Sequence, residues 1–257
     1  MYREKLSLAG RNALVTGGGQ GIGLAICEAL AEAGAHVTIA TRDPRDAEAG
    51  RQALAARNYA ADGVVVDVTD AAAVTAIADR LAASDHPIDV LICNAGISRS
   101  QNPAESMSDD DWLDVVDINV NGTFWCCRAF GRHMLAAGRG SIVNVGSISG
   151  LIVNRPQGQS SYNASKAAVH HLTKCLAAEW AGRGVRVNAV APTYIDTPMT
   201  AFAKSNRAMY DTWMDATPMG RVGTVEEIAS VVHFLASDAA SLLTGSIVVA
   251  DGGYTCW

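Results

Sequence analysis

The 257-residue sequence has little of what several classes of protein require. Its six cysteines form no C-x-x-C pair and none lies at zinc-ligand spacing from a histidine, so we expect reduced thiols and no metal site. The longest apolar runs have strand length, and no hydrophobic signal region follows the first five residues, so we expect no membrane span and a cytoplasmic protein. The net charge of −6, without a basic patch, argues against a nucleic-acid partner.

What the sequence does contain is a regular alternation of strand-like and helix-like segments. A chain of this length, 49% hydrophobic, suits one domain over residues 1–257. Strands are predicted at residues 12–16, 36–41, 63–66, 90–93, 141–145, 185–190 and 246–250, and helices at 24–33, 71–83, 112–135, 162–180 and 225–235. Such alternation predicts an α/β fold, a single-domain Rossmann-type doubly wound parallel sheet of about seven strands.

A glycine-rich loop follows the first predicted strand. Gly17-Gly18-Gly19-Gln20-Gly21-Ile22-Gly23 separates that strand from a helical segment that ends at Gly34. Strand, glycine loop and helix in this order favour binding of a dinucleotide, because the backbone can approach a pyrophosphate and the helix N-terminus offers free N–H groups. A simple flexible turn is the less favoured alternative.

Tyr162 and Lys166 lie four residues apart in a predicted helix. This spacing places both side chains on one face, ~6 Å apart along the axis. A phenol has an ordinary pKa of about 10, and a neighbouring ammonium group favours the phenolate. We therefore predict a tyrosine whose lowered pKa allows proton transfer near neutral pH.

Six ordered motifs together resemble those of the short-chain dehydrogenase/reductase family, from about Leu8 to Gly253. They are Thr16-Gly17-x-x-x-Gly21-x-Gly23, Asn94-Ala95-Gly96, Asn119-Val120-Asn121-Gly122, Ser147 after a strand, Tyr162-x-x-x-Lys166, and Asn188-Ala189-Val190-Ala191-Pro192. The resemblance implies an enzyme that interconverts a secondary alcohol and a ketone with NADP or NAD.

The resemblance also implies roles for four residues. Tyr162 is the general acid/base, and Ser147 hydrogen-bonds the same substrate oxygen. Lys166 also binds the nicotinamide ribose, and Asn119 anchors a water that relays protons from Lys166 to solvent. The remaining implied cofactor contacts are Gly17, Gly19, Gln20, Gly21, Ile22, Gly23, Thr41, Arg42, Asp67, Val68, Asn94, Ala95, Gly96, Pro192, Thr193, Ile195, Thr197 and Met199. Thr193 departs from the family, which usually has glycine there.

The end of the second strand bears on the choice between NADP and NAD. The family's acidic position for the ribose hydroxyls falls on the uncharged Thr41, and Arg42 follows as a candidate ligand for the 2′-phosphate. Asp43 is a rival that would favour NAD, but Asp43-Pro44 is also a ready N-cap and N1 pair for the next helix. We therefore favour NADP, although the neutral Gln20 weakens this choice.

The substrate is less well defined. We expect the substrate pocket to be lined by Ser147, Ser149, Asn154 and Tyr162. A lid at residues 198–220, rich in Met, Phe and Trp, is expected to cover this pocket. Segments including Ile152-Val153-Asn154-Arg155-Pro156-Gln157 and the C-terminal Trp257 resemble the sugar-alcohol branch, similar to galactitol dehydrogenases, which commonly uses NAD. The alternatives are a 3-oxoacyl-[acyl-carrier-protein] reductase and a catalytically silent NAD(P)-binding sensor. The resemblance further implies a homotetramer.

Overall fold

The computed structural model describes residues 1–99 and 102–257. Seven parallel strands form one sheet in the order β3-β2-β1-β4-β5-β6-β7. The strands are β1 (Asn12–Thr16), β2 (His36–Thr41), β3 (Ala61–Val65), β4 (Val90–Cys93), β5 (Gly140–Val145), β6 (Val185–Pro192) and β7 (Ile247–Ala250). This confirms the predicted doubly wound sheet, with boundaries that shift by at most two residues.

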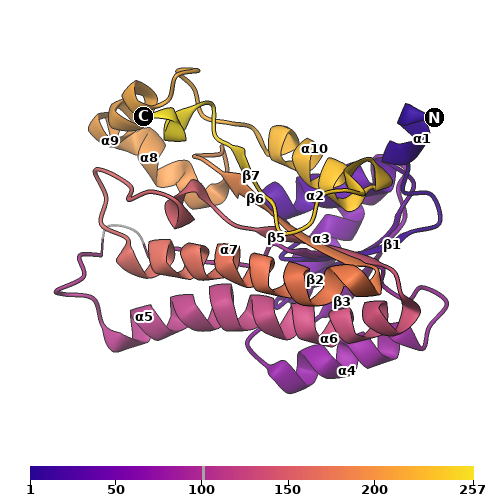
Figure 1. Cartoon of the computed structure of the whole chain (residues 1–257). Coiled ribbons are helices and arrows are strands. Elements are labelled where there is room, and N and C mark those ends of the chain that lie inside the picture. Colours follow the sequence, from indigo (N-terminus) through magenta and orange to yellow (C-terminus); the bar gives the residue numbers. More distant parts are fainter. Residues whose placement is uncertain (100–101) are drawn as a thin grey trace.

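The helices cover both faces of the sheet (Figure 1). They are α1 (Tyr2–Leu6), α2 (Gly21–Glu32), α3 (Pro44–Ala55), α4 (Ala71–Ala82), α5 (Asp109–Val116), α6 (Gly122–Ala137), α7 (Ser160–Trp180), α8 (Ala201–Ser205), α9 (Arg207–Ala216) and α10 (Val225–Ala236). In the part of the chain that is described, no helix has both the length and the apolar character needed to cross a membrane.

Alternating side chains of the central strands build two separate cores. Val15 of β1 packs with α2 and α10 on one face, whereas its neighbour Leu14 packs with α4, α6 and α7 on the other. Both faces are buried because parallel strands are covered by crossover helices on each side. This explains why the strand segments are nearly continuous apolar runs.

The predicted helix at residues 112–135 lies within one continuous helical segment, residues 109–137. Its two α-helical parts, α5 and α6, are joined by a π-helical turn at Asp117–Asn121, which the sequence did not predict. The side chain of Asn119 lies in this turn and hydrogen-bonds the loop after β4. Single π-helical turns of this kind are frequent at functional sites.

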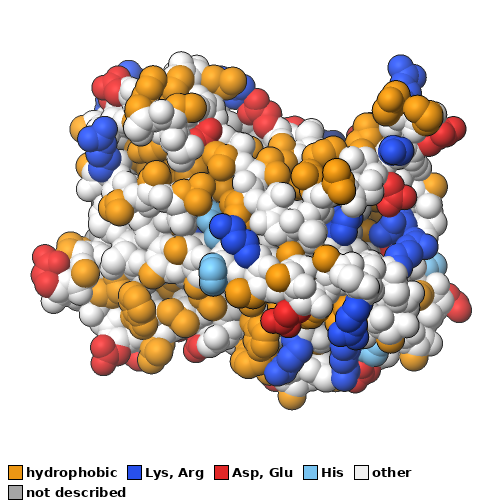
Figure 2. All heavy atoms as spheres, viewed as in Figure 1, with side chains coloured by type: hydrophobic (Ala, Val, Ile, Leu, Met, Phe, Trp, Pro, Cys, Tyr) orange, Lys and Arg blue, Asp and Glu red, His pale blue; other side chains and the backbone are white. Residues whose placement is uncertain are grey.

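A smaller apolar cluster lies over the carboxyl ends of β5 and β6. Trp213 and Met209 of α9 pack there against Ile148, Tyr194 and Tyr254. In Figure 2, hydrophobic side chains also gather on the surface over α5 and around α8 and α9. The predicted lid is thus helical, and its inner side is anchored on the main body.

The sheet order reverses at β1, which has β2 on one side and β4 on the other. In an open parallel sheet, the strand ends beside this switch point leave a crevice in which ligands bind. The glycine loop after β1 and Asn94 after β4 meet at this crevice.

Candidate functional site

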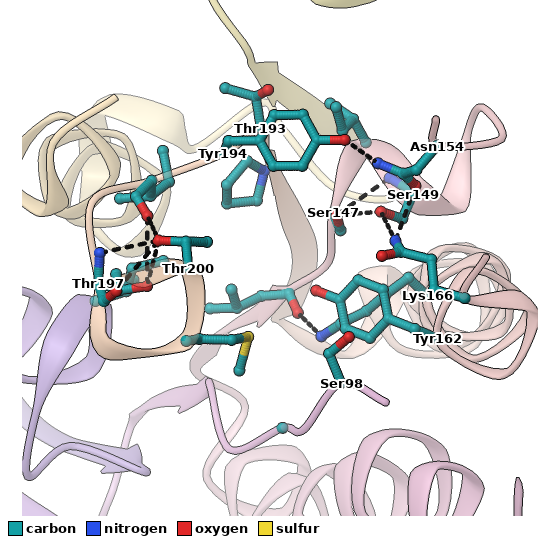
Figure 3. A pocket seen from close by; sticks show the side chains of 18 of the residues that line it. Ser98, Ser147, Ser149, Asn154, Tyr162, Lys166, Thr193, Tyr194, Thr197 and Thr200 are labelled. Atoms are coloured by element: carbon teal, nitrogen blue, oxygen red, sulfur yellow. Dashed lines mark hydrogen bonds between the residues drawn. The ribbon is translucent and has the colours of Figure 1, made fainter. Parts of the chain in front are cut away.

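Four polar residues predicted from the motifs come from three elements near the carboxyl edge of the sheet. Ser147 follows β5, Tyr162 and Lys166 lie on α7, and Asn119 lies in the π-helical turn before α6. Ser147, Tyr162 and Lys166 line one cavity of about 320 Å³ (Figure 3). Asn119 does not line that cavity but lies behind Gly96, where an added Cβ would be 3.1 Å from its Oδ1.

The ammonium group of Lys166 is withdrawn from water beneath the phenol. Its Nζ donates a 2.8 Å hydrogen bond to the carbonyl oxygen of Val145 and lies 5.5 Å from the centroid of the Tyr162 ring. Desolvation lowers the pKa of Lys166 to about 8. The lysine therefore changes charge close to physiological pH.

The pKa of Tyr162 differs from the prediction. Desolvation raises it above its ordinary value, and a hydrogen bond with Ser147 opposes this rise without reversing it. The prediction that Lys166 gives Tyr162 a lowered pKa is therefore wrong for the chain by itself. The physical reason is that both groups lie in the same poorly solvated place, which disfavours the charged form of each.

Asn119 fixes the loop after β4 to the helix that carries the tyrosine. Its Oδ1 accepts a hydrogen bond from the Ile97 backbone N–H, and its Nδ2 donates to the Ile97 carbonyl and to the Ser165 hydroxyl, all at 2.9–3.0 Å. The amide side chain is thus occupied by three protein partners. Its predicted water-anchoring role stays a prediction.

The glycine loop has the shape that a dinucleotide requires. Gly17 has a φ of +64°, and a Cβ added at Gly23 would collide with the carbonyl oxygen of Gly17. Asn94 holds the loop in place, because its Nδ2 donates to the carbonyls of Thr16 and Gly17 at 3.0 and 3.1 Å. Gln20, the N-cap of α2, makes no side-chain capping bond, so the first N–H groups of that helix are available to a phosphate.

Two cavities share Gly96 in their linings. The second, which we call the adenine-side cavity, is also about 320 Å³ and is lined by nine of the predicted cofactor contacts: Gly17, Gly19, Gln20, Thr41, Arg42, Asp67, Val68, Ala95 and Gly96. Seven other predicted cofactor contacts line the first cavity: Ile22, Asn94, Pro192, Thr193, Ile195, Thr197 and Met199. Gly21 and Gly23 line neither cavity. Gly23 packs beneath the loop, and an added Cβ at Gly21 would lie 3.8 Å from Thr197.

Asp43, after β2, is the N-cap of the next helix, as the sequence predicts, whereas the phosphate-binding role of Arg42 stays a prediction. The Asp43 carboxylate caps α3 through the backbone N–H of Arg45 at 2.8 Å, and Arg45 also binds it through two nitrogens. These contacts lower the pKa of Asp43 to about 2. Within the described residues, no protein partner occupies the exposed Arg42 guanidinium, which lines the adenine-side cavity.

The predicted substrate residues Ser147, Ser149 and Asn154 lie together in the first cavity (Figure 3). Ser147 Oγ donates to Ser149 Oγ and accepts from the Ser149 backbone N–H, both at 3.1 Å. The sequence analysis missed Gln159 and Tyr194, which line the same wall. The one signal for the tyrosine in the sequence is its place directly after Pro192-Thr193, at the end of a strand whose carboxyl end faces the site.

Thr193 stands where the family usually has glycine, and the structure shows where its side chain lies. Its side chain lines the first cavity, and no hydrogen-bond partner for its buried Oγ1 is found in residues 1–99 and 102–257. The wall therefore has room for the threonine without closing the cavity. No group of three or more His, Cys, Asp and Glu side chains within these same ranges could hold a metal ion.

Comparisons with known proteins agree with this geometry. A family model described as enoyl-(acyl carrier protein) reductase matches residues 17–255. The chain is 57% identical to galactitol 2-dehydrogenase of Rhizobium johnstonii and 51% identical to the L-tagatose-forming galactitol 2-dehydrogenase of Cereibacter sphaeroides, covering 100% of this chain and 99% of each relative. This chain belongs to the short-chain dehydrogenase/reductase family. It is an NAD(P)-dependent oxidoreductase acting on CH–OH donors.

A solved relative of this family superposes along the whole chain. The gluconate 5-dehydrogenase of Burkholderia cenocepacia, in complex with NADP and tartrate, has a TM-score of 0.95 at 37% identity, with 100% of both chains covered. The two-cavity crevice described above therefore belongs to a fold that holds a dinucleotide in that relative.

His170 of α7 is a buried residue beside the catalytic serine. Only 5% of it is exposed, and its Nε2 lies 3.5 Å from the backbone N–H of Ser147, which donates to it. A Cβ at Gly150 would be 2.8 Å from the imidazole. The imidazole therefore fills the space between α7 and the loop that carries Ser147.

Burial of His170 should make the protein less stable in acid. Desolvation, with Lys166 and Lys174, lowers its pKa from 6.5 to about 4, so between these values the unfolded chain binds a proton that the folded protein does not. The free energy of unfolding should fall as the pH falls through this window, by up to ~3 kcal/mol from this group. Denaturant unfolding at a series of pH values should show that the free energy of unfolding depends less on pH in His170→Asn than in the wild type.

The exposed neighbour His171 supplies the control His171→Asn, which should behave like the wild type. If the free energy of unfolding changed equally with pH in the wild type and in His170→Asn, His170 would not be the group responsible.

Proposed function

We propose that this enzyme oxidises a polyol at a secondary alcohol and reduces the corresponding ketose, with galactitol as the first substrate to test. The observation that carries the proposal is the convergence of Tyr162, Ser147 and Lys166 in a cavity whose remaining wall is rich in hydroxyl and amide side chains. The two galactitol 2-dehydrogenases named above support the choice of substrate.

In the proposed mechanism, the substrate oxygen lies between the hydroxyls of Tyr162 and Ser147. The serine hydroxyl is held by Ser149, and the serine backbone N–H donates to His170, so the hydroxyl can position that oxygen without reorganising. Tyr162 Oη takes the hydroxyl proton during oxidation and returns it during reduction. The nicotinamide group supplies hydride acceptance and donation.

Lys166 tunes this proton transfer. Its ammonium group is fixed by the Val145 carbonyl and lies beneath the tyrosine ring, so a phenolate formed at Tyr162 has a nearby positive charge. The lysine pKa of about 8 means that this charge weakens as the solution becomes alkaline. Asn119 holds the loop beside Lys166, consistent with its proposed part in proton relay.

We favour NADP over NAD. Both Asp43 and Arg42 line the adenine-side cavity, but the Asp43 carboxylate is bound by Arg45 and by the end of α3, whereas the Arg42 guanidinium is exposed. A guanidinium group matches the geometry of a phosphate through paired N–H donors. The NADP bound to the gluconate 5-dehydrogenase relative supports this preference without excluding NAD.

The 3-oxoacyl-[acyl-carrier-protein] reductase alternative is less well supported. Its substrate carries an apolar chain on an acidic carrier, and among the described cavity-lining residues Lys166 alone is charged. A silent sensor would have no need for a phenol and an ammonium group buried together. Helices α8 and α9, with the short turn Pro198–Thr200 before them, would act as the lid over the substrate, because Met199, Phe202 and Trp213 line the cavity.

The assembly and location are also proposals. A homotetramer is supported by exposed apolar side chains on α5, where Trp112 and Leu113 are 42% and 52% exposed. Trp257, 78% exposed at the C-terminus, would then lie near a neighbouring subunit. A cytoplasmic location stays a prediction from the cysteine content.

Tyr162→Phe should abolish most turnover and leave dinucleotide affinity almost unchanged. Loss of a general acid/base lowers kcat by about 100- to 10,000-fold, whereas the ring and its packing remain. Steady-state kinetics with galactitol and fluorescence titration of NADPH would measure the two effects. The exposed Tyr2 provides the control Tyr2→Phe. Substantial residual turnover in Tyr162→Phe would remove this residue from the proposed role.

Arg42→Ala should reduce kcat/KM for NADP by about 10- to 100-fold, because a charged hydrogen bond contributes ~1.5–3 kcal/mol, and should change kcat/KM for NAD little. The control Arg57→Ala removes the same charge from a residue that is paired with Glu28. A strong NAD preference in the wild-type enzyme would overturn the assignment of Arg42.

A further inference from the structure

Three primary amides lie side by side in the wall of the catalytic cavity. Asn154, Gln157 and Gln159 are 6%, 6% and 8% exposed, and all three line the cavity that contains Tyr162. Amides this deeply buried need hydrogen-bond partners. The hydrogen bonds that these amides make within the protein determine which of their N–H and C=O groups remain free to bind a substrate.

The cluster is tied to a pair of stacked aromatic rings. The Tyr194 hydroxyl accepts hydrogen bonds from Asn154 Nδ2 at 2.9 Å and from Gln157 Nε2 at 3.1 Å. Its ring stacks on Trp213 of α9 at a centroid distance of 3.7 Å, and Trp213 Nε1 donates to Gln157 Oε1 at 3.2 Å. The amides are therefore held in fixed orientations by the body of the protein and by the lid.

The third amide joins the cluster to the catalytic serine. Gln159 Nε2 donates to Asn154 Oδ1 at 3.0 Å and to Ser149 Oγ at 3.3 Å, and Ser149 is bonded to Ser147. A continuous polar wall thus runs from the reacting position towards the lid.

The hydrogen-bonding capacity left over suits hydroxyl groups. Asn154 and Gln157 each use one N–H on Tyr194 and keep the other, while Gln159 Oε1 accepts none of the bonds described above. A substrate hydroxyl can accept a hydrogen bond from a free N–H of Asn154 or Gln157 and can donate one to Gln159 Oε1. A carboxylate can only accept, and its charge needs a paired cation when it leaves water.

The described lining of the cavity offers such a carboxylate no cation that is free to pair with it. Among its described lining residues, Lys166 alone is charged, and it is 5% exposed and bonded to Val145 beneath Tyr162. The amide cluster itself is neutral, and burial raises the pKa of Tyr194, so that its hydroxyl stays protonated.

We propose that this amide cluster makes the site selective for neutral polyols and ketoses over sugar acids of the same chain length. Asn154 and Gln157 are the specificity-determining residues, and Tyr194 positions both of them. This inference rests on the proposed polyol oxidoreductase function and defines its substrate class more narrowly.

Galactitol and galactonate provide the direct test, because they share chain length and hydroxyl configuration and differ by one carboxylate. In the wild-type enzyme, kcat/KM for galactitol should exceed that for galactonate by at least about tenfold. As a competitive inhibitor of galactitol oxidation, galactonate should have an inhibition constant at least about tenfold above the KM of galactitol.

Asn154→Lys should shift the ratio of the two kcat/KM values towards galactonate by about tenfold or more, because it places a cation in the cluster. The matched control is Val153→Lys, which adds the same charge at a neighbouring residue that is 86% exposed and outside the cavity. Thermal unfolding would establish that each variant is folded. If Asn154→Lys does not fold, Asn154→Asp should shift the ratio further towards galactitol.

Wild-type turnover of galactonate within threefold of galactitol would overturn the inference, as would an equal shift in Val153→Lys and Asn154→Lys. Either result would leave the polyol oxidoreductase proposal standing. By contrast, Tyr162-dependent turnover of an acetoacetyl thioester without turnover of any polyol or ketose would defeat that proposal itself.

Discussion

The site depends on an ammonium group that the fold keeps out of water. Lys166 lies one helical turn after Tyr162, and its hydrogen bond to the Val145 carbonyl fixes α7 against the end of β5. This contact sets the position of the phenol relative to the serine that follows β5. It also keeps a titratable cation in a place where its charge has a large effect on neighbouring groups.

Two asparagines fix the loops around this contact through side-chain hydrogen bonds. Asn94 fixes the glycine loop to the end of β4, and Asn119 fixes the next loop segment to α7. The dinucleotide crevice and the proton-transfer groups are therefore both held by side-chain amides, of the half-buried Asn94 and the buried Asn119. On the far side of the cavity, Tyr194 and Trp213 connect to α9, so that the lid and the substrate wall are parts of the same network.

Residue types and their spacing predicted the parallel sheet, the glycine loop and the shared helix face of Tyr162 and Lys166, because each depends on short-range pattern, whereas Ser147 was implied by the resemblance to the family. The π-helical turn within the helix at 112–135 could not be predicted, because the Asn119 side-chain contacts that accompany it involve a distant loop. The pKa of Tyr162 could not be predicted from its spacing to Lys166, since desolvation depends on everything packed around both groups. The Tyr194 cluster likewise joins residues from three separate segments.

The chain by itself favours a protonated phenol, whereas the oxidised dinucleotide carries a positive charge on its nicotinamide ring that favours the phenolate. Ultraviolet difference titration of the wild type and Tyr162→Phe, each with and without oxidised dinucleotide, would test this account most directly. One phenol that is missing in Tyr162→Phe should ionise above pH 10 in the free enzyme and at a clearly lower pH in the complex. Ionisation at the same pH in both states would contradict the account.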